Sequence, residues 1–273
     1  MRNKLTFAIL YDFDGTLAKG NMQEYGFMEK LNIKSDEFWQ KSDTLALEQN
    51  ADSNLAYMKI MLDEAKKIGK TREDFIACGK NIHFFKGVLE WFDRIDAFAK
   101  KLGIRVEHYL LSSGLSEIVE GTPIYKKFKK VYACRFMYNE NNEADWPAQV
   151  VNYTTKTQYI HRISKGCLQE CDKSVNNRTQ PEDRVIPFNR MLYIGDGLTD
   201  IPCMSNLKTY GGHTLAVYTP NQKGNKKVAN QLLSDGRVDT IAPADYTEGS
   251  KLDIYVKALL KKAKADYDFE QSL

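Results

Sequence analysis

Four short runs of apolar residues, each without regular polar alternation, constrain the fold of this chain most strongly. They span Leu5–Tyr11, Val106–Leu111, Met191–Ile194 and Thr214–Tyr218. Such runs are typical of central strands that are covered on both faces, as in a parallel α/β sheet. In open α/β sheets, chemistry gathers where the strands end at their carboxyl edge. We therefore expect an α/β fold with a functional site beyond the ends of these strands.

A long stretch with helical spacing separates the first two runs. Ser35 and Thr71 are expected to begin helices with acidic residues in the first turn. Apolar residues recur at helical spacing over 55–65 and over 89–99. Because the stretch carries no strand pattern, it favours a separate helical module inserted between the first and second strands.

The second half of the chain shows three further patterns. Val131–Tyr138 and Ala148–Tyr153 flank the polar segment Asn139–Asp145, which predicts a strand pair joined by a long loop. Residues 170–185 are polar and are expected to form a surface loop. The last helix is predicted over Leu252–Lys264, with a lysine-rich end that suits a helix C-terminus.

Composition and charge exclude several classes of protein. The 273 residues are 42% hydrophobic, and 39 Lys and Arg against 36 Asp and Glu leave a net charge of only +3. This balance argues against nucleic acid or an anionic membrane surface as the main partner. No apolar run approaches the ~20 residues that span a bilayer. The oligomeric state cannot be read from the sequence.

The five cysteines indicate reduced thiols and a cytoplasmic protein. Cys167 and Cys171 lie four residues apart, but no second Cys or His pair follows at the spacing of a zinc site. A structural role is therefore favoured over metal binding for these two residues.

Two pairs of acidic residues follow predicted strands. Asp12 and Asp14 come directly after the first run, and Asp196 and Asp200 follow the third. An Asp-Gly turn would explain either pair without function. If the four acids meet, their repulsion requires a cation, because two charges about 4 Å apart interact by roughly 4 kcal/mol at an effective dielectric near 20. An all-oxygen set favours Mg²⁺, which commonly bridges to phosphate.

Two weaker signals lie between these pairs. Ser112, Ser113 and Gly114 follow the second run and predict either an anion-binding turn or a helix N-cap, with equal weight. Lys156 precedes a helical pattern, where its charge opposes the helix dipole and calls for an anionic partner. Taken alone, Lys156 is better explained as a solvated surface lysine.

Taken in order, these segments resemble the four motifs of the haloacid dehalogenase-like (HAD) superfamily of phosphohydrolases. The motifs are Asp12–Thr16, Ser112, Lys156 and Gly195–Asp200. The resemblance implies a Mg²⁺-dependent phosphatase that acts on a small phosphorylated metabolite, with no role for nucleic acid or membrane.

The resemblance also implies a domain organisation. A Rossmann-like parallel sheet core would comprise residues 1–17 and 104–273, and 18–103 would form an inserted helical cap. The insert is similar to the cap of phosphoserine phosphatase relatives, and Phe85–Glu90 resembles the segment where those chains re-enter the core.

The resemblance assigns a role to each catalytic residue. Asp12 would be the nucleophile that forms an aspartyl-phosphate, and Asp14 would act as general acid and then general base. Ser112 would hydrogen-bond a phosphoryl oxygen, and Lys156 would offset negative charge. The residues expected to contact the substrate phosphate are Asp12, Gly15, Thr16, Ser112, Ser113, Gly114 and Lys156.

The metal site implied by the resemblance consists of acids alone. Asp12 and Asp196 would bind Mg²⁺ through their carboxylates, Asp14 through its backbone carbonyl, and Asp200 would orient the metal's surroundings. Phosphoserine phosphatases usually place an acid shortly after the first motif to meet the substrate ammonium. Here Lys19 occupies that stretch and the first acid is Glu24, so the sequence leaves the substrate open.

Two alternatives to a hydrolase remain at this stage. The same aspartyl-phosphate could serve a phosphotransferase that passes the phosphoryl group to another acceptor. A non-catalytic metabolite-binding protein could also use this scaffold, although it would not need to keep Asp14 or Lys156.

Overall fold

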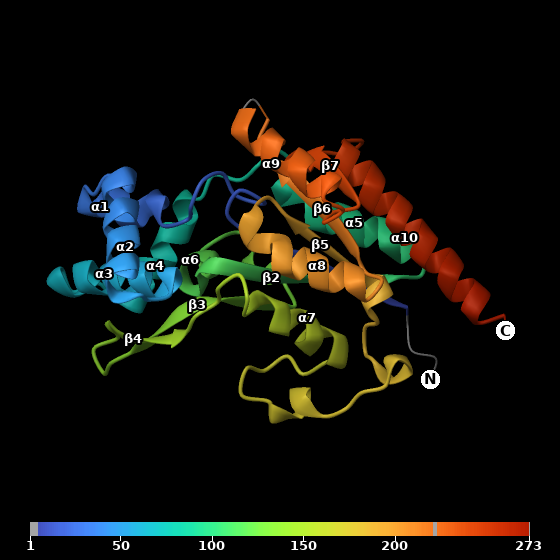
Figure 1. Cartoon of the computed structure of the whole chain (residues 1–273), viewed down its shortest axis with the longest axis horizontal. Coiled ribbons are helices and arrows are strands. Elements are labelled where there is room, and N and C mark those ends of the chain that lie inside the picture. The colour runs from blue at the N-terminus through green and yellow to red at the C-terminus, as the bar shows by residue number, and fades with distance from the viewer. Residues whose placement is uncertain (1–4, 221–222, 273) are drawn as a thin grey trace.

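Seven strands form one sheet in the computed structural model, which describes residues 5–220 and 223–272 (Figure 1). All neighbouring strands are parallel except the last pair at one edge, where the third and fourth strands are antiparallel. The strands are β1 (Thr6–Tyr11), β2 (Arg105–Leu115), β3 (Lys130–Tyr138), β4 (Ala144–Gln149), β5 (Met191–Gly195), β6 (His213–Tyr218) and β7 (Thr240–Pro243). Their spatial order is β4-β3-β2-β1-β5-β6-β7.

The four apolar runs are confirmed as β1, β2, β5 and β6, the central strands of this sheet. The register places Tyr11 of β1 opposite Leu110 of β2 and Ile194 of β5. Because these strands are parallel, the segments after Tyr11 and after Ile194 leave the sheet at the same edge. The topology therefore brings together the two acidic motifs, which are the first and the fourth along the chain.

Helices cover both faces of the sheet, with α7 and α8 on one side and α5 and α10 on the other (Figure 1). The helices from residue 88 onward are α5 (Val88–Lys101), α6 (Ser116–Glu120), α7 (Lys156–Lys165), α8 (Ile201–Thr209), α9 (Lys223–Ser234) and α10 (Lys251–Glu270). No helix within residues 5–220 and 223–272 is both long enough and apolar enough to cross a lipid bilayer.

The stretch after β1 is helical, as predicted, and its first helices lie beside the β3–β4 end of the sheet (Figure 1). They are α1 (Glu29–Leu31), α2 (Ser35–Gln49), α3 (Ser53–Lys67) and α4 (Arg72–Cys78). Thr71 caps α4 in a capping box with Asp74, as its sequence predicts. Within the same stretch, α5 packs against β2 and α10. The cap boundaries at 17/18 and 103/104 stay a prediction.

The strand pair predicted within residues 131–153 is present, but its second strand lies earlier in the chain than the sequence pattern predicts. β4 spans Ala144–Gln149 rather than Ala148–Tyr153. The loop is tighter than expected, because the Asn139 side chain accepts hydrogen bonds from the backbone N–H groups of Asn141 and Glu143. Val151 leaves the hairpin and donates its N–H to the Cys134 sulfur.

Three other elements differ from the expectation. β2 continues to Leu115, so Ser112, Ser113 and Gly114 lie inside the strand and not after it. β7 was not anticipated, and α10 extends to Glu270. The polar segment 170–185 is a loop as predicted, with two short 3₁₀ turns.

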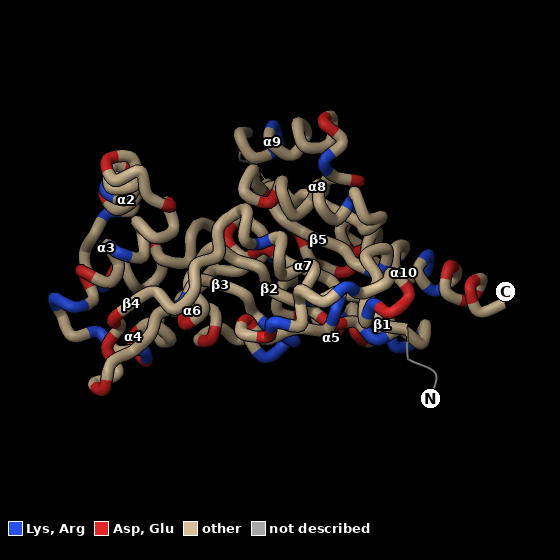
Figure 2. The backbone as a smooth tube through the Cα atoms, turned by 60° about the horizontal axis from the view of Figure 1, so that its bottom comes forward, with Lys and Arg blue, Asp and Glu red and all other residues tan. Residues whose placement is uncertain are grey.

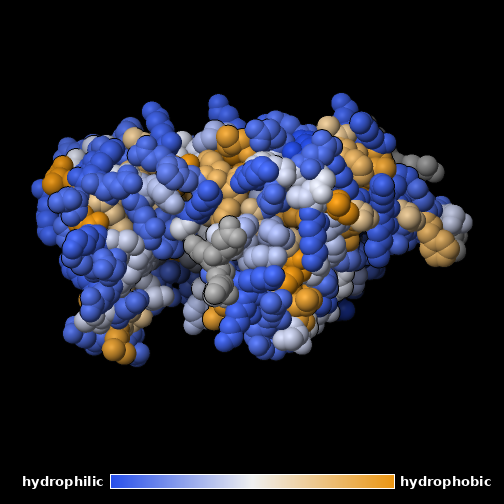
Figure 3. Space-filling model, turned by 90° about the horizontal axis from the view of Figure 1, so that it is seen from above, coloured by the Kyte–Doolittle hydropathy of each residue, from blue (hydrophilic) through white to orange (hydrophobic). Residues whose placement is uncertain are grey.

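Charge is spread over the whole molecule. Acidic and basic residues lie near one another along α2, α3, α5 and α10, whereas β1, β5, β6 and β7 carry neither (Figure 2). Hydrophilic residues cover most of the face shown in Figure 3. This distribution agrees with the small net charge of +3.

Candidate active site

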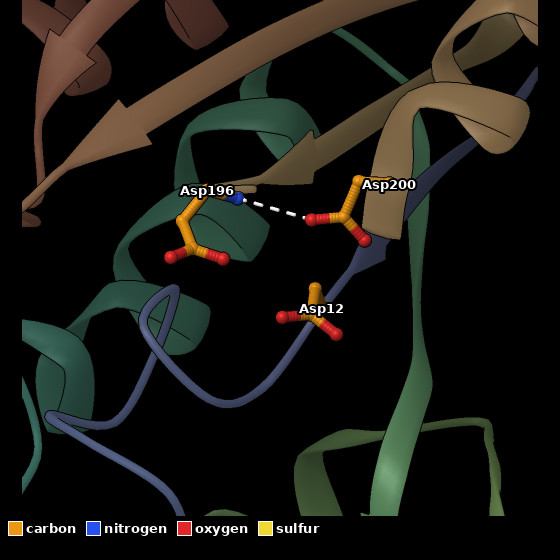
Figure 4. A group of neighbouring side chains, drawn as sticks. All are labelled: Asp12, Asp196 and Asp200. Atoms are coloured by element: carbon orange, nitrogen blue, oxygen red, sulfur yellow. Dashed lines mark hydrogen bonds between the residues drawn. The ribbon is translucent and has the colours of Figure 1, made fainter. Parts of the chain in front are cut away.

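Three aspartates converge at the carboxyl edge of the sheet (Figure 4). Asp12 directly follows β1, Asp196 directly follows β5, and Asp200 ends the 3₁₀ turn Leu198–Asp200 that leads into α8. One carboxylate oxygen from each residue lies within 4.8 Å of the other two. The predicted convergence of these distant acids is therefore present in the fold.

Lys156 supplies the positive charge beside them. Its Nζ donates to Asp12 Oδ1 at 2.6 Å and to Asp200 Oδ1 at 3.0 Å, and its side chain is only 1% exposed. Lys156 begins α7, whose buried Ile160 and Ile163 hold the helix on the sheet. The anionic partner inferred from the helix dipole is thus a pair of carboxylates, and Lys156 is not a surface lysine.

Asp200 is fixed by several donors at once. Tyr193 donates its hydroxyl to Asp200 Oδ1 at 2.6 Å, and the N–H groups of Asp196 and Gly197 lie 3.1 and 3.3 Å from Oδ2. Both carboxylate oxygens are therefore engaged within the protein. Asp200 is suited to orient Lys156 and the Asp196 loop, while Asp12 and Asp196 keep oxygens available.

The electrostatics of the cluster favour a bound cation. Burial raises the pKa of Asp12 to about 6, with a further rise from Asp200 and an opposing effect of Lys156. Burial and the nearby carboxylates of Asp12 and Asp200 raise the pKa of Asp196 to about 8. Asp12 and Asp200 in turn raise the pKa of Lys156 despite its burial. Three carboxylates facing one ammonium leave excess negative charge at this site.

The donor set fits Mg²⁺. Only oxygen ligands meet at the cluster, and Mg²⁺ is usually held by one or two carboxylates together with water and phosphate oxygens. Gly15 keeps the site open, because a Cβ at this position would lie 2.2 Å from Asp196 Oδ2. Gly15 also has a φ of +73°, a conformation that L side chains rarely adopt.

Asp14 lies next to the cluster but its carboxylate turns toward the segment that follows. Asp14 Oδ1 accepts the backbone N–H of Met22 at 2.8 Å. Burial and the Asp12 charge raise the pKa of Asp14 well above its usual range. A protonated Asp14 carboxyl can donate to an oxygen of a bound ligand.

The predicted phosphate-binding residues lie around the same edge. Thr16 Oγ1 lies 3.5 Å from Asp12 Oδ2. Ser112 is buried, and its Oγ accepts the N–H of Gly114 at 3.0 Å. Ser113 and Gly114 line a cavity that also contains Asp12, Asp14, Gly15 and Lys156.

This cavity has a volume of about 640 Å³, which is within the range of small-molecule sites. Its floor is formed by the strand ends, and its opposite wall comes from the helical stretch after β1. That wall includes Gln23, Trp39, Asn54 and Tyr57. Tyr57 of α3 donates its hydroxyl to the Ser113 carbonyl at 2.6 Å, which ties the wall to β2.

A relative in sequence spans almost the whole chain. An uncharacterized protein of Borreliella burgdorferi is 31% identical over 276 residues, which cover 90% of this chain and 93% of that protein. The chain belongs to the same family as this protein. No model of a known protein family matches the sequence.

Solved structures with a similar fold identify the architecture. A substrate-bound phosphoserine phosphatase has a TM-score of 0.58 at 16% identity, covering 94% of this chain and 99% of that chain. A phospho-aspartyl intermediate analogue of phosphoserine phosphatase has a TM-score of 0.57 at 17% identity, with 93% and 99% covered. A HAD family hydrolase from Salmonella enterica serovar Typhi has a TM-score of 0.56 at 13% identity, with 95% and 73% covered. The chain has the HAD fold.

Several residues of the candidate site are not marked by any pattern in the sequence. Trp39, Asn54 and Tyr57 lie on α2 and α3 within ordinary helical patterns, so nothing in the sequence marks them as cavity residues. Tyr193 lies in the apolar run of β5, and Gln23 follows the first motif without any motif of its own. No spacing rule would have identified these residues without the fold.

Proposed function

We propose that this protein is a Mg²⁺-dependent phosphatase that hydrolyses a small-molecule phosphomonoester through an aspartyl-phosphate on Asp12. The observation that carries the proposal is the pairing of Asp12 with Lys156 at 2.6 Å, beside Asp196 and Asp200. This arrangement holds a carboxylate nucleophile next to a fixed ammonium, at a cavity of metabolite size.

In the first step, an Asp12 oxygen attacks the phosphorus and the bond to the leaving oxygen breaks. Asp14 gives its proton to that oxygen, which leaves as an alcohol. The raised pKa of Asp14 supports this role, because burial and the Asp12 charge favour the protonated carboxyl over the charged one. In the second step, Asp14 takes a proton from a water molecule whose oxygen attacks the phosphorus. Inorganic phosphate leaves and Asp12 is restored.

Other groups of the chain position the phosphoryl group. Lys156 offsets charge on Asp12 and the phosphate, and Ser112, Ser113 and Gly114 provide hydrogen-bonding groups beside the cavity. Asp12 and Asp196 would hold Mg²⁺ with their carboxylates and Asp14 with its carbonyl, while Asp200 orients them. Bound Mg²⁺ supplies charge neutralisation for the phosphoryl oxygens.

We infer a metabolite substrate from the wall above the site. Residues 18–103 would form a cap that excludes bulk water and macromolecules from the cavity. We also propose a cytoplasmic location, since all five cysteines are unpaired, as expected in a reducing compartment.

The decisive experiment measures phosphate release from a panel of phosphomonoesters, p-nitrophenyl phosphate included, with and without Mg²⁺. Wild type is expected to need Mg²⁺, and Asp12→Asn is expected to lose activity at least about a thousandfold, as removal of a covalent nucleophile does. An Asp12→Asn variant that is folded and retains wild-type activity would rule out the covalent mechanism. Product analysis with added alcohols separates hydrolysis from phosphotransfer.

A further inference from the structure

Gln23 is a buried amide whose oxygen lacks a hydrogen-bond partner in the described structure. The residue is 2% exposed, and its Oε1 is buried without a partner among residues 5–220 and 223–272. Buried polar groups are nearly always satisfied, and an unsatisfied one costs free energy comparable to a lost hydrogen bond. Gln23 lines the cavity of the candidate active site. Gln23 therefore combines a place in the cavity lining with an unused hydrogen-bonding group.

The backbone holds Gln23 in place over the site. The neighbouring Met22 donates its N–H to Asp14 Oδ1 at 2.8 Å, and its sulfur accepts the N–H of Leu115 at 3.1 Å. Met22 is fully buried and packs against Gly114. Gln23 is thus attached to a residue that is anchored to both the first and the second motif, so its position relative to the phosphate site is fixed.

The cavity wall that includes Gln23 also contains two aromatic residues. Trp39 and Tyr57 line the cavity and pack edge to face, with ring centroids 6.0 Å apart. Glu24 stabilises this wall, because its Oε1 accepts from Asn21, Ser35 and the Trp39 indole. The first acid after motif one is therefore engaged with protein donors.

The carboxylates that line the cavity all belong to the first and fourth motifs. They are those of Asp12, Asp14 and Asp196, and no other carboxylate in the described part of the chain lines the cavity. Lys19 and Lys156 contribute positive charge to the same lining. An ammonium group on a substrate would find no counter-ion apart from these aspartates, which the proposed phosphoryl transfer already uses, and leaving a charge unpaired in such a site is costly.

We propose that Gln23 selects the leaving group, hydrogen-bonding an uncharged ring compound that packs against Trp39 and Tyr57. This inference rests on the proposed phosphatase function. The chemistry suits either a sugar or the base of a nucleoside, because both present a flat or apolar face and a hydrogen-bonding edge. Phosphorylated amines such as phosphoserine and phosphoethanolamine are excluded as preferred substrates.

The test compares kcat/KM of the Mg²⁺-loaded enzyme for four phosphomonoesters. Uridine 5′-monophosphate and ribose 5-phosphate represent the uncharged leaving groups, and phosphoserine and phosphoethanolamine the ammonium-bearing ones. Wild type is expected to prefer the first pair by at least about a hundredfold. p-Nitrophenyl phosphate serves as the general phosphatase substrate.

Two substitutions of similar size separate the contributions of Gln23. Gln23→Leu removes the hydrogen bond and should lower the preference for the uncharged substrates about tenfold or more. Gln23→Glu places a carboxylate in the wall and should shift the preference toward phosphoethanolamine by a similar factor. If Gln23→Leu lowers uridine monophosphate hydrolysis more than ribose phosphate hydrolysis, the base is the recognised group. An equal loss assigns the sugar.

Gln40 of α2 provides the matched control, because it is exposed and does not line this cavity. Gln40→Leu and Gln40→Glu should leave all substrate ratios unchanged. If wild type hydrolyses p-nitrophenyl phosphate but prefers the amines, or if the Gln23 variants leave the ratios unchanged, the inference is overturned and the phosphatase function stands. Absence of hydrolysis for every substrate would overturn both.

Discussion

At the residue scale, Gly15 lies where the loop after β1 passes closest to the Asp196 carboxylate. We predict that Gly15→Ala lowers Mg²⁺ affinity at least tenfold, because the new Cβ would lie 2.2 Å from Asp196 Oδ2. Calorimetric titration with Mg²⁺ measures this loss. Gly103→Ala is the control, since Gly103 has a similar φ of +74° but no neighbouring atom within 4 Å of an added Cβ. Equal Mg²⁺ binding by both variants would show that the contact with Asp196 is unimportant.

Glu117 is a buried carboxyl whose protonation affects the stability of the fold. Its Oε1 accepts the Phe136 N–H and the Tyr138 hydroxyl, while its Oε2 is buried without a partner among the residues described. Burial raises the pKa of Glu117 in the folded state. Its protonated form therefore stabilises the fold at acidic pH, and this contribution is lost as pH rises through the raised pKa.

Glu117→Gln removes this titration and can keep both hydrogen bonds to its side-chain oxygen. We expect the free energy of unfolding of the variant, relative to wild type, to increase from pH 4.5 to pH 8. Urea denaturation at a series of pH values measures the difference. A difference that stays constant over this range would contradict the assignment.

At the element scale, α4 and α6 pack so closely that a side chain at Gly121 cannot be accommodated. A Cβ at Gly121 would lie 1.7 Å from the Ile76 carbonyl oxygen. We predict that Gly121→Ala destabilises the protein by about 1–3 kcal/mol, as overpacking typically does. Gly224→Ala in α9 is the control, because an added Cβ there meets no atom within 4 Å and alanine favours the helix. Thermal and urea unfolding compare the two variants, and equal stability would refute close α4–α6 packing.

The sequence predicts the strands that are covered on both faces, because each of them is a continuous apolar run. It misses strands whose apolar run is too short to recognise. β1 and β5 stand out because every residue from Phe7 to Tyr11 and from Met191 to Gly195 is buried. β7 contributes only Ile241 and Ala242 as buried residues, too few for a recognisable run. The acids and Lys156 were predictable because motif order implies their position, whereas Trp39 and Gln23 reach the cavity only through tertiary packing.

At the scale of the whole molecule, the sheet order gathers residues from distant parts of the chain into one charged cluster. Asp12 and Asp196 are brought together by the pairing of β1 with β5, and Lys156 arrives on α7. Assembling like charges at a buried site opposes folding, so the cluster lowers the stability of the metal-free protein. A divalent cation that binds only the folded state reverses this effect.

The linkage between metal binding and folding gives a prediction for the whole molecule. At a Mg²⁺ concentration about 100 times the Kd, binding adds about 2.7 kcal/mol to the free energy of unfolding. For a chain of this size, that raises the unfolding midpoint by about 5–10 °C. Asp196→Asn should raise the midpoint without Mg²⁺, because it removes a buried carboxyl whose raised pKa opposes folding, and should abolish the further rise with Mg²⁺. Asp43→Asn on the exposed surface of α2 should respond to Mg²⁺ like wild type. Scanning calorimetry of the three proteins checks this, and an equal Mg²⁺ response in Asp196→Asn and wild type would place the cation elsewhere.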